Sequence, residues 1–487
     1  MNYQKKFKDE TIQKINDIPE VVPPFHSSVT MSIKKGKKKM PLWKRTTIIV
    51  SSAVLGSLVL VTAIPALIVC FISFQYVSSY QTLNRNFALN ELDSTYQPLN
   101  NITYPSSAKQ NVSVDSRYTD AVNTFANNIY QNLNSDEANF SFAPMSLYAN
   151  LSILSLGSTD ASVMNQFDTL LALPEDERTS NYPSFYQNDY YATDSGTTQF
   201  YNGLFQSELF GTINEDFIAQ LANYYCEAYS IDFQKQSDVA KMVSWANERM
   251  NDDQFLSIDD LPISSDTALY LLTTLTFDNK WLTEYSRSDS YQDLFYVTPS
   301  QEVEATYMRH IYWGNYYDYD SYYSFYDNYK NDMKIKYIVP KSTSDNIFNL
   351  TDGVNLFIDD NAALHSGEGI RCAVPKFSSS SSLDFVDVLT QLGYGSFFDS
   401  HTDSFGSIYE DDCLLPIYLS TCQQKNQIAF TEDGTTITSV TWSGLAAGSA
   451  APIEGGIDVQ LNQPFIYIIY DNNNLPLYVG NVTNPIQ

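Results

Sequence analysis

Residues 462–485, NQPFIYIIYDNNNLPLYVGNVTNP, close the chain with the pattern that decides its fold. The apolar and aromatic run Phe465–Tyr470 predicts a buried β-strand, and it ends at a turn of Asp and Asn residues. Strand-like runs also precede it at 270–277, 333–339, 427–430 and 457–461. Strands therefore accumulate in the second half of the chain.

The first half shows helix patterns instead. Ala121, Phe125, Ile129 and Leu133 recur every four residues, which predicts a helix with one apolar face. After a polar turn, Pro144 starts a second apolar run that extends to 156 and ends at Gly157. Helices early in the chain and strands late indicate an α+β domain.

Composition excludes several classes of function. The 487 residues are 43% hydrophobic, enough to bury a large core, and the net charge is −28. So acidic a protein repels phosphate backbones, and we therefore expect no nucleic-acid partner. The five Cys include no CxxC and there are only 4 His, so we expect no metal and no cofactor.

One segment predicts a membrane anchor. Residues 46–75 are apolar, and no charged residue lies between Arg45 and Arg85. Lys and Arg crowd the amino-terminal flank, so the positive-inside rule places residues 1–45 in the cytoplasm. Residues 76–115 are then a polar stalk, and 116–487 form the outer domain. A cleaved signal peptide is the alternative, but the 45-residue head and the long apolar run disfavour it.

Several motifs, in order along the chain, resemble those of the serpins, a family of large protease inhibitors. The closing pair is the most specific: 462–465 resembles N-x-P-F, and 476–485 resembles P-L-F-x-G-x-V-x-N-P. The other matching segments are 139–146, with Ala143 in place of a serine, 244–247, 276–281, and 373–377 followed by 388–389 and 392–393.

The resemblance implies a serpin fold over 116–487, preceded by the single transmembrane helix. Such a fold has large mixed β-sheets, about eight or nine helices and an exposed reactive centre loop. On its residues alone, 431–463 is a mobile surface loop, since it is poor in large apolar residues. In serpins a protease attacks this loop and forms an acyl-enzyme with it. The freed segment of the loop then inserts into the large sheet. The inhibitor contributes no nucleophile, so we expect no catalytic residues and no enzymatic activity.

The start of this loop resembles the serpin hinge. Glu432, Gly434 and Thr435 match the motif E-x-G-T, in which glycine allows the bend and a small residue begins insertion. Ile437, Ser439 and Thr441 follow where inhibitory members carry small residues. Thr and Ile favour a strand, yet the bulk of Ile437 on the buried side would slow insertion. Inhibition is a race between insertion and hydrolysis, so a non-inhibitory serpin, acting as a surface binding module or a mere substrate, is the alternative.

The scissile bond falls in a window rather than at one residue. Counting from the hinge suggests Gly448–Ser449, and counting back from Pro464 moves the bond later. The window contains Leu445, Ala446, Ala447, Gly448, Ser449, Ala450 and Ala451. No Lys or Arg occurs from Gly434 to Gln463, so the loop lacks the basic side chain that a trypsin-like pocket binds. We expect an elastase-like or subtilisin-like serine protease as the target; cysteine proteases are the alternative class.

The remaining expectations concern single residues and location. Trp281 is expected in the core, and Thr273 falls where the family has an asparagine beneath the opening sheet. Cys413 and Cys422 are expected as two free thiols, with a disulfide as the alternative. We expect a monomeric, bacterial-type serpin held at the cell membrane by a single span, with its domain outside the cell.

Overall fold

The computed structural model describes residues 97–133, 139–158, 160–207, 209–264, 266–358, 363–410, 413, 415–436 and 456–486. The predicted cytoplasmic tail 1–45, the predicted span 46–75 and residues 76–96 of the predicted stalk lie outside these ranges. Within them, no helix combines the length and the apolar character that crossing a membrane requires.

Eight α-helices form within the described residues, as the resemblance implies. They are α3 (Ser116–Asn132), α4 (Pro144–Ser155), α5 (Ala161–Leu170), α6 (Glu175–Asp189), α7 (Glu215–Leu221), α8 (Gln236–Met250), α9 (Ile347–Leu350) and α10 (Val386–Leu389). The two helices predicted from periodicity are α3 and α4. Asp115 caps α3 by accepting a hydrogen bond from the Arg117 N–H, and Pro144 occupies the first turn of α4, where its missing N–H costs nothing.

The nine-stranded sheet contains the closing motif of the chain. Its order is β1-β16-β15-β9-β8-β7-β10-β14, and β6 also pairs with β7. The strands are β1 (Phe140–Phe142), β6 (Tyr291–Thr298), β7 (Gln301–Asp318), β8 (Tyr322–Asn328), β9 (Lys334–Pro340), β10 (Ala363–Pro375), β14 (Ile457–Gln460), β15 (Phe465–Tyr470) and β16 (Pro476–Val482). Every residue of β15 and β16 is buried, which explains why this motif is almost free of charge.

The seven-stranded sheet carries the residues that resemble the hinge. Its order is β11-β12-β13-β5-β3-β2, and β4 pairs with β3. The strands are β2 (Tyr191–Thr193), β3 (Gly196–Gln206), β4 (Cys226–Ser230), β5 (Leu269–Lys280), β11 (Phe377–Asp384), β12 (Gln423–Phe430) and β13 (Gly434–Thr436). The short β13 therefore lies between two long neighbours.

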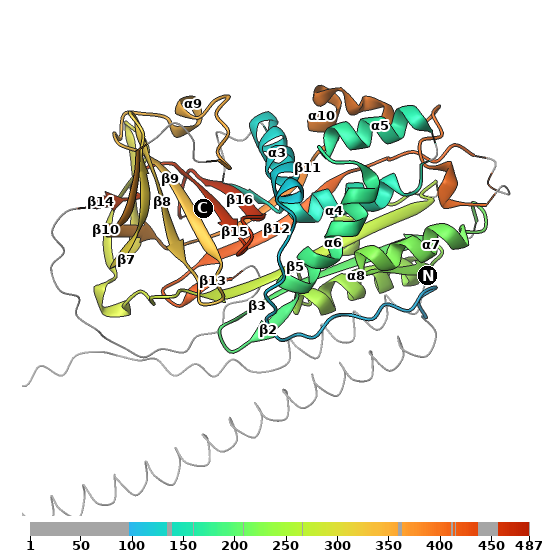
Figure 1. The fold of residues 1–487 in the computed structure, drawn as a ribbon, viewed down its shortest axis with the longest axis horizontal. Helices are drawn as coiled ribbons and strands as arrows, with labels where there is room; N and C mark the ends of the chain where they lie inside the picture. The colour runs from blue at the N-terminus through green and yellow to red at the C-terminus, as the bar shows by residue number, and fades with distance from the viewer. Residues whose placement is uncertain are drawn as a thin grey trace, which may run out of the picture. The chain divides into compact units, whose positions relative to one another are not determined.

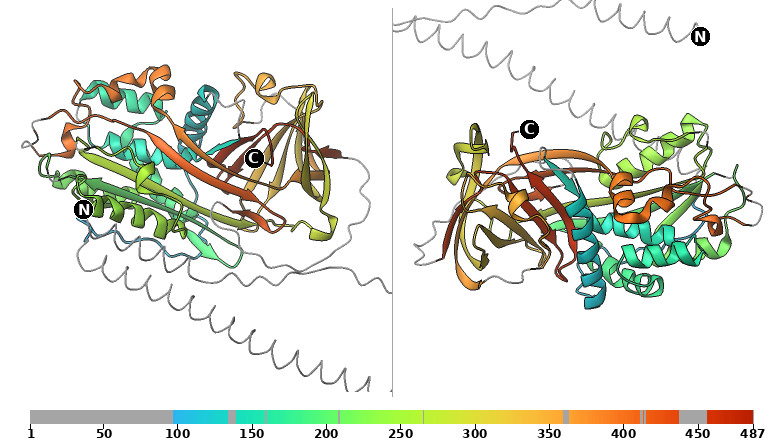
Figure 2. Two further views of the ribbon diagram at one scale, coloured as in Figure 1. Left: turned by 180° about the vertical axis from the view of Figure 1, so that it is seen from behind. Right: turned by 90° about the horizontal axis from the view of Figure 1, so that it is seen from above.

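Helices and strands gather at opposite ends of the domain. In Figure 1 most helices lie at one end and the nine-stranded sheet curls at the other, while β5 and β12 run between the two ends. Figure 2 shows the same division from behind and from above. A single large hydrophobic core joins both ends, and a smaller cluster around Trp245 and Met242 packs α8 onto β3 and β5.

The described part of the polar segment before α3 lies against the seven-stranded sheet. The Leu99 N–H donates to the Ala228 carbonyl oxygen at 2.7 Å, and the Asn100 side chain bonds to two further backbone groups of β4. The Tyr104 ring contacts four other tyrosine rings, and its hydroxyl donates to Glu227 at 2.9 Å. Residues 99–104 thus cover an edge strand.

Candidate functional site

The first residues of the predicted reactive loop lie inside the sheet. Gly434 pairs with Lys280 of β5, and Thr435 pairs with Asn279 of β5 and with Phe430 of β12. Both pairings are antiparallel. Gly434 and Thr435, which resemble the hinge, therefore lie with Thr436 in a short strand between β5 and β12.

Gly434 is required by the closeness of its neighbour. A Cβ atom at this position would collide with the backbone carbonyl of Asn279. Since that obstacle is backbone and cannot turn aside, any other residue would push β13 away from β5. The glycine that the resemblance assigns to the hinge thus has a steric reason here.

Thr435 enters a buried aromatic cluster. Its hydroxyl lies 2.8 Å from the hydroxyl of Tyr329, whose ring stacks on Trp281 with centroids 4.6 Å apart. Trp281 is fully buried, and its Nε1–H donates to the Thr431 carbonyl oxygen at 2.8 Å. Trp281 is a core residue, as predicted, and it also holds the chain that leads into the hinge.

Glu432 anchors the hinge through its charge. Its side chain is almost fully buried and accepts hydrogen bonds from Lys376 Nζ at 3.0 Å and from Ser290 Oγ at 2.9 Å. Burial would raise the pKa of Glu432, but the hydrogen bond from Lys376, with help from Ser290, lowers it below its usual value. Next to it, the Asp433 carboxylate forms an ion pair with Arg287 at the surface.

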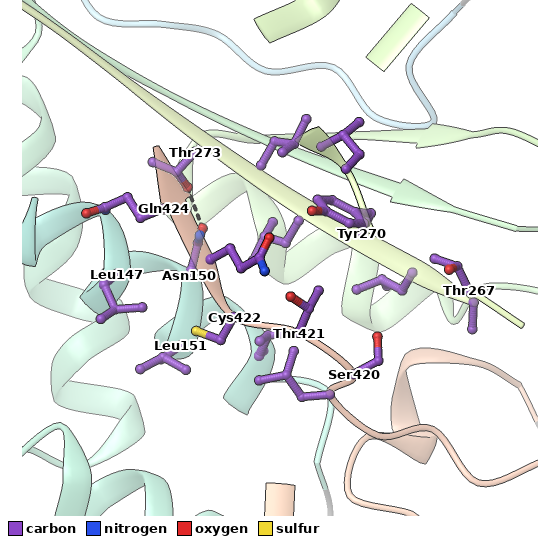
Figure 3. Close-up of a pocket in the computed structure, with 18 of the residues that line it drawn as sticks. Leu147, Asn150, Leu151, Thr267, Tyr270, Thr273, Ser420, Thr421, Cys422 and Gln424 are labelled. Carbon is purple, nitrogen blue, oxygen red and sulfur yellow. Dashed lines mark hydrogen bonds between the residues drawn. The ribbon is translucent and has the colours of Figure 1, made fainter. Parts of the chain in front are cut away.

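Within the described residues, β13 joins β5 and β12 at Asp278–Lys280 and Ala429–Phe430. Among the strand pairings of the described residues, none joins β5 directly to β12. A cavity of about 280 Å³ lies in that region. It is lined by residues 269–274 of β5, by residues 416–425 and by α4 (Figure 3).

The cavity has a polar centre on α4 and β5. The Thr273 hydroxyl donates to the amide oxygen of Asn202 at 2.7 Å and also bonds to Asn150 of α4 (Figure 3). Thr273, at the position where the family has an asparagine, therefore links Asn150 and Asn202. On the other wall, the hydroxyl of Thr421 is buried and has no hydrogen-bond partner among the described residues. The cavity thus has polar side chains on both walls.

The structure accounts for only part of the predicted site. It brings Glu432, Gly434 and Thr435 together with Trp281, whereas Ile437, Ser439, Thr441 and the window Leu445–Ala451 lie outside the described residues. Sequence analysis did not identify Tyr329, Lys376 or Asn150 as site residues. Lys376 does lie in the P-K-F segment that carries the resemblance, and this was the available signal for it.

The cysteines and potential metal ligands add no further site. Cys413 and Cys422 are free thiols, as predicted, and burial raises the pKa of Cys422 to about 12. Within the described ranges, no group of three His, Cys, Asp or Glu side chains is placed to hold a metal ion.

Comparisons with known proteins agree with this geometry. The family model described as serpin (serine protease inhibitor) matches residues 120–485. An uncharacterized serpin-like protein of Methanosarcina acetivorans is 23% identical over 387 residues, 75% of this chain and 87% of its own. Alpha-1-antiproteinase of sheep (Ovis aries) is 25% identical over 389 residues, 74% of this chain and 87% of its own.

Solved structures show the same fold. The thermophilic serpin tengpin in its native state superposes with a TM-score of 0.66 at 23% identity, covering 80% of this chain and 99% of tengpin. Thyroxine-binding globulin in complex with thyroxine gives a TM-score of 0.61 at 18% identity, covering 75% and 99% of the two chains.

Proposed function

Because the chain belongs to the serpin family of serine protease inhibitors, we propose that it is a membrane-tethered, extracellular suicide inhibitor of elastase-like or subtilisin-like proteases. One observation carries the proposal: Gly434–Thr436 form the first residues of a strand whose path continues into an open cavity between β5 and β12. A loop cleaved beyond this point could complete the strand.

The register of β13 supports the predicted cleavage window. Because Gly434 faces Lys280 in an antiparallel pair, continuing one residue for one would place Leu445 opposite Leu269. Leu269 is the first residue of β5. Cleavage at or after Leu445 would therefore free a segment as long as β5, and Leu445 is also the first residue of the window.

Side-chain alternation then assigns the inserted residues to faces. Thr435 shares the buried face with Asn279, so Ile437 would face Phe277, Ser439 would face Leu275 and Thr441 would face Thr273. Phe277 is fully buried, which suits the apolar Ile437. Thr441 would reach the hydroxyl of Thr273 and the amide of Asn150. This match of polarity favours insertion and offsets the bulk of Ile437.

Target class and location rest on the sequence. The loop has no basic residue between Gly434 and Gln463, and its window is made of small and apolar residues that elastase-like and subtilisin-like proteases accept. The apolar segment 46–75, with its basic amino-terminal flank, supports a single-pass anchor with the domain outside the cell. The protein acts as a substrate that traps its protease and has no catalytic residues of its own.

The test is to incubate the full chain, in detergent, with pancreatic elastase and with subtilisin. We expect a covalent complex that survives a denaturing gel, with cleavage mapped by mass spectrometry to Leu445–Ala451. Thr435→Arg is the control, because arginine cannot enter the buried site of Thr435; it should be cleaved at the same bond without forming the complex. Cleavage of the wild type without a complex, at any bond, would contradict inhibition and favour the binding-module alternative.

A further inference from the structure

A buried polar cluster lies directly behind the hinge and has no part in the function described so far. His310 of β7 and Asp327 of β8 have side chains 7% and 4% exposed, with His310 Nε2 3.1 Å from Asp327 Oδ2. Cys372 of β10 faces His310 across the β7–β10 pairing. Burying an ion pair costs desolvation free energy, so a buried pair need not increase stability. We therefore asked which other residues the pair contacts.

Tyr285 connects this pair to the hinge. Its hydroxyl donates to Asp327 Oδ2 at 3.0 Å, and its ring stacks on His310 with centroids 3.8 Å apart. Its backbone N–H donates to the carbonyl oxygen of Glu432 at 3.1 Å. The same ring meets Trp281 edge-on at 5.5 Å. Tyr285 thus bonds to the hinge through its backbone N–H and to the buried pair through its side chain.

The surroundings of His310 favour its protonated form. The groups that face it are Asp327, Cys372, Tyr285 and Tyr312. Burial alone would lower the pKa of His310, but Cys372 and Asp327 raise it to about 10. Protonated His310 can donate from Nε2 to Asp327 Oδ2, which also accepts from the Tyr285 hydroxyl.

Insertion needs a fixed starting point at the hinge. Gly434 must stay opposite Lys280 while the later residues enter, because a slip of one residue would turn every following side chain to the wrong face. Glu432 lies two residues before Gly434. A contact that holds the Glu432 carbonyl therefore helps to set the register of the strand, together with the hydrogen bonds from Trp281 to Thr431 and Asp433.

We propose that Tyr285, locked by the buried His310–Asp327 pair, is a positioning residue that fixes the register and hence the speed of loop insertion. This inference rests on the proposed inhibitory function and deepens it. The pair would then be retained for insertion rather than for stability alone.

The first test compares two buried tyrosine hydroxyls in the full chain. Tyr285→Phe removes the hydroxyl that Asp327 holds, whereas Tyr148→Phe removes one that donates to the Leu171 carbonyl oxygen at 3.0 Å in the helical end of the core. Both variants lose a buried hydrogen bond, and Tyr285→Phe also loses a 3.6 Å contact of its hydroxyl with Cys372 Sγ. Tyr285→Phe should raise the number of inhibitor molecules cleaved per protease trapped roughly fivefold, and Tyr148→Phe should leave it near the wild-type value. An equal ratio in the two variants would overturn the proposal.

The second test asks whether a conservative change rescues. His310→Gln can keep a side-chain N–H donor to Asp327 Oδ2, whereas His310→Leu removes that donor and leaves Oδ2 with the Tyr285 hydroxyl. We expect the Leu variant to behave like Tyr285→Phe and the Gln variant to recover most of the wild-type ratio. If the Gln and Leu variants give the same ratio, His310 does not act through its contact with Asp327.

A third measurement is independent of inhibition. In the uncleaved protein, hydrogen exchange of the amides at 430–436 should accelerate in Tyr285→Phe and stay unchanged in Tyr148→Phe. If the wild type traps neither protease, the proposed function fails, yet the exchange result still shows whether Tyr285 positions the hinge. Unchanged exchange in Tyr285→Phe would refute the positioning role even in an active inhibitor.

Discussion

At the scale of single residues, the buried carboxylate of Glu432 forms an ion pair with Lys376 next to the hinge. Its pKa is lowered, so its contribution to stability is fully present above the ordinary glutamate pKa and is lost as pH falls through the folded-state value. Glu432→Gln should lower the free energy of unfolding at pH 7 by about 1–3 kcal/mol, because the ion pair between Glu432 and the half-buried Lys376 is lost. The difference from wild type should shrink as pH falls below the ordinary glutamate pKa and the carboxylate is protonated. Urea unfolding of wild type and variant at pH 7 and at pH 3 measures this difference. A difference that is the same at both pH values would contradict a stabilising role of the ionised Glu432.

Two buried aspartates, Asp189 and Asp471, have the opposite pH dependence of stability. Asp189 and Asp471 are fully buried, and Asn188 Nδ2 donates to both at 3.1 and 3.4 Å. Burial raises the pKa of both groups, and the nearby charge of Asp189 raises that of Asp471 further. Since the folded state holds its protons more tightly than the unfolded state, stability from this pair falls as pH rises above the ordinary aspartate pKa.

Asp471→Asn should therefore stabilise the protein more at pH 8 than at pH 5. The asparagine oxygen can still accept from the backbone N–H groups of Asn473 and Leu475, so the turn after β15 keeps its hydrogen bonds. Thermal unfolding of wild type and variant at the two pH values measures the effect. Asp458→Asn, at a side chain 77% exposed, is the control and should show no such difference. A gain that is the same at both pH values would exclude titration of the pair as its cause.

At the scale of elements, local pattern predicted some parts and tertiary contacts decided the rest. The predicted strands at 270–277 and Phe465–Tyr470 are recovered in β5 and β15, because both segments are rich in apolar and β-branched residues that are visible in sequence. β7 was not predicted: its 18 residues mix charged, aromatic and small side chains with no steady alternation of burial. The hydrogen bond from Tyr285 to Glu432 joins residues far apart in sequence, and no local pattern reports such a contact.

The segment that covers β4 supplies a prediction at the same scale. Tyr104 contacts the rings of Tyr186, Tyr190, Tyr201 and Tyr225 and bonds to Glu227. Tyr104→Ala should destabilise the domain by about 2–4 kcal/mol, since a large ring packed on other rings is lost. Tyr104→Phe, which removes only the hydroxyl, should cost about 1 kcal/mol. Denaturant unfolding gives both values, and an alanine variant as stable as the phenylalanine variant would show that the ring adds little.

At the scale of the whole molecule, the opening between β5 and β12 makes the uncleaved state incomplete. β5 pairs with β3 and β12 pairs with β11, but no described strand pairing joins β5 to β12 along the cavity of about 280 Å³. A segment running from Gly434 to Leu445 would pair with the full length of β5 and fill that space. Insertion would therefore add ladder hydrogen bonds and apolar contacts in a single step.

Cleavage should accordingly stabilise the protein rather than weaken it. After complete cleavage within Leu445–Ala451, we expect the melting temperature to rise by about 10 °C or more, because each new buried hydrogen bond contributes about 1 kcal/mol and several form together. Thr435→Arg, cut at the same bond, should gain nothing, since its hinge cannot enter beside Tyr329. Scanning calorimetry before and after cleavage measures the change. If cleaved wild type melts where uncleaved wild type does, the cavity is not the place that receives the loop, and the register drawn from Gly434 and Lys280 would have to be abandoned.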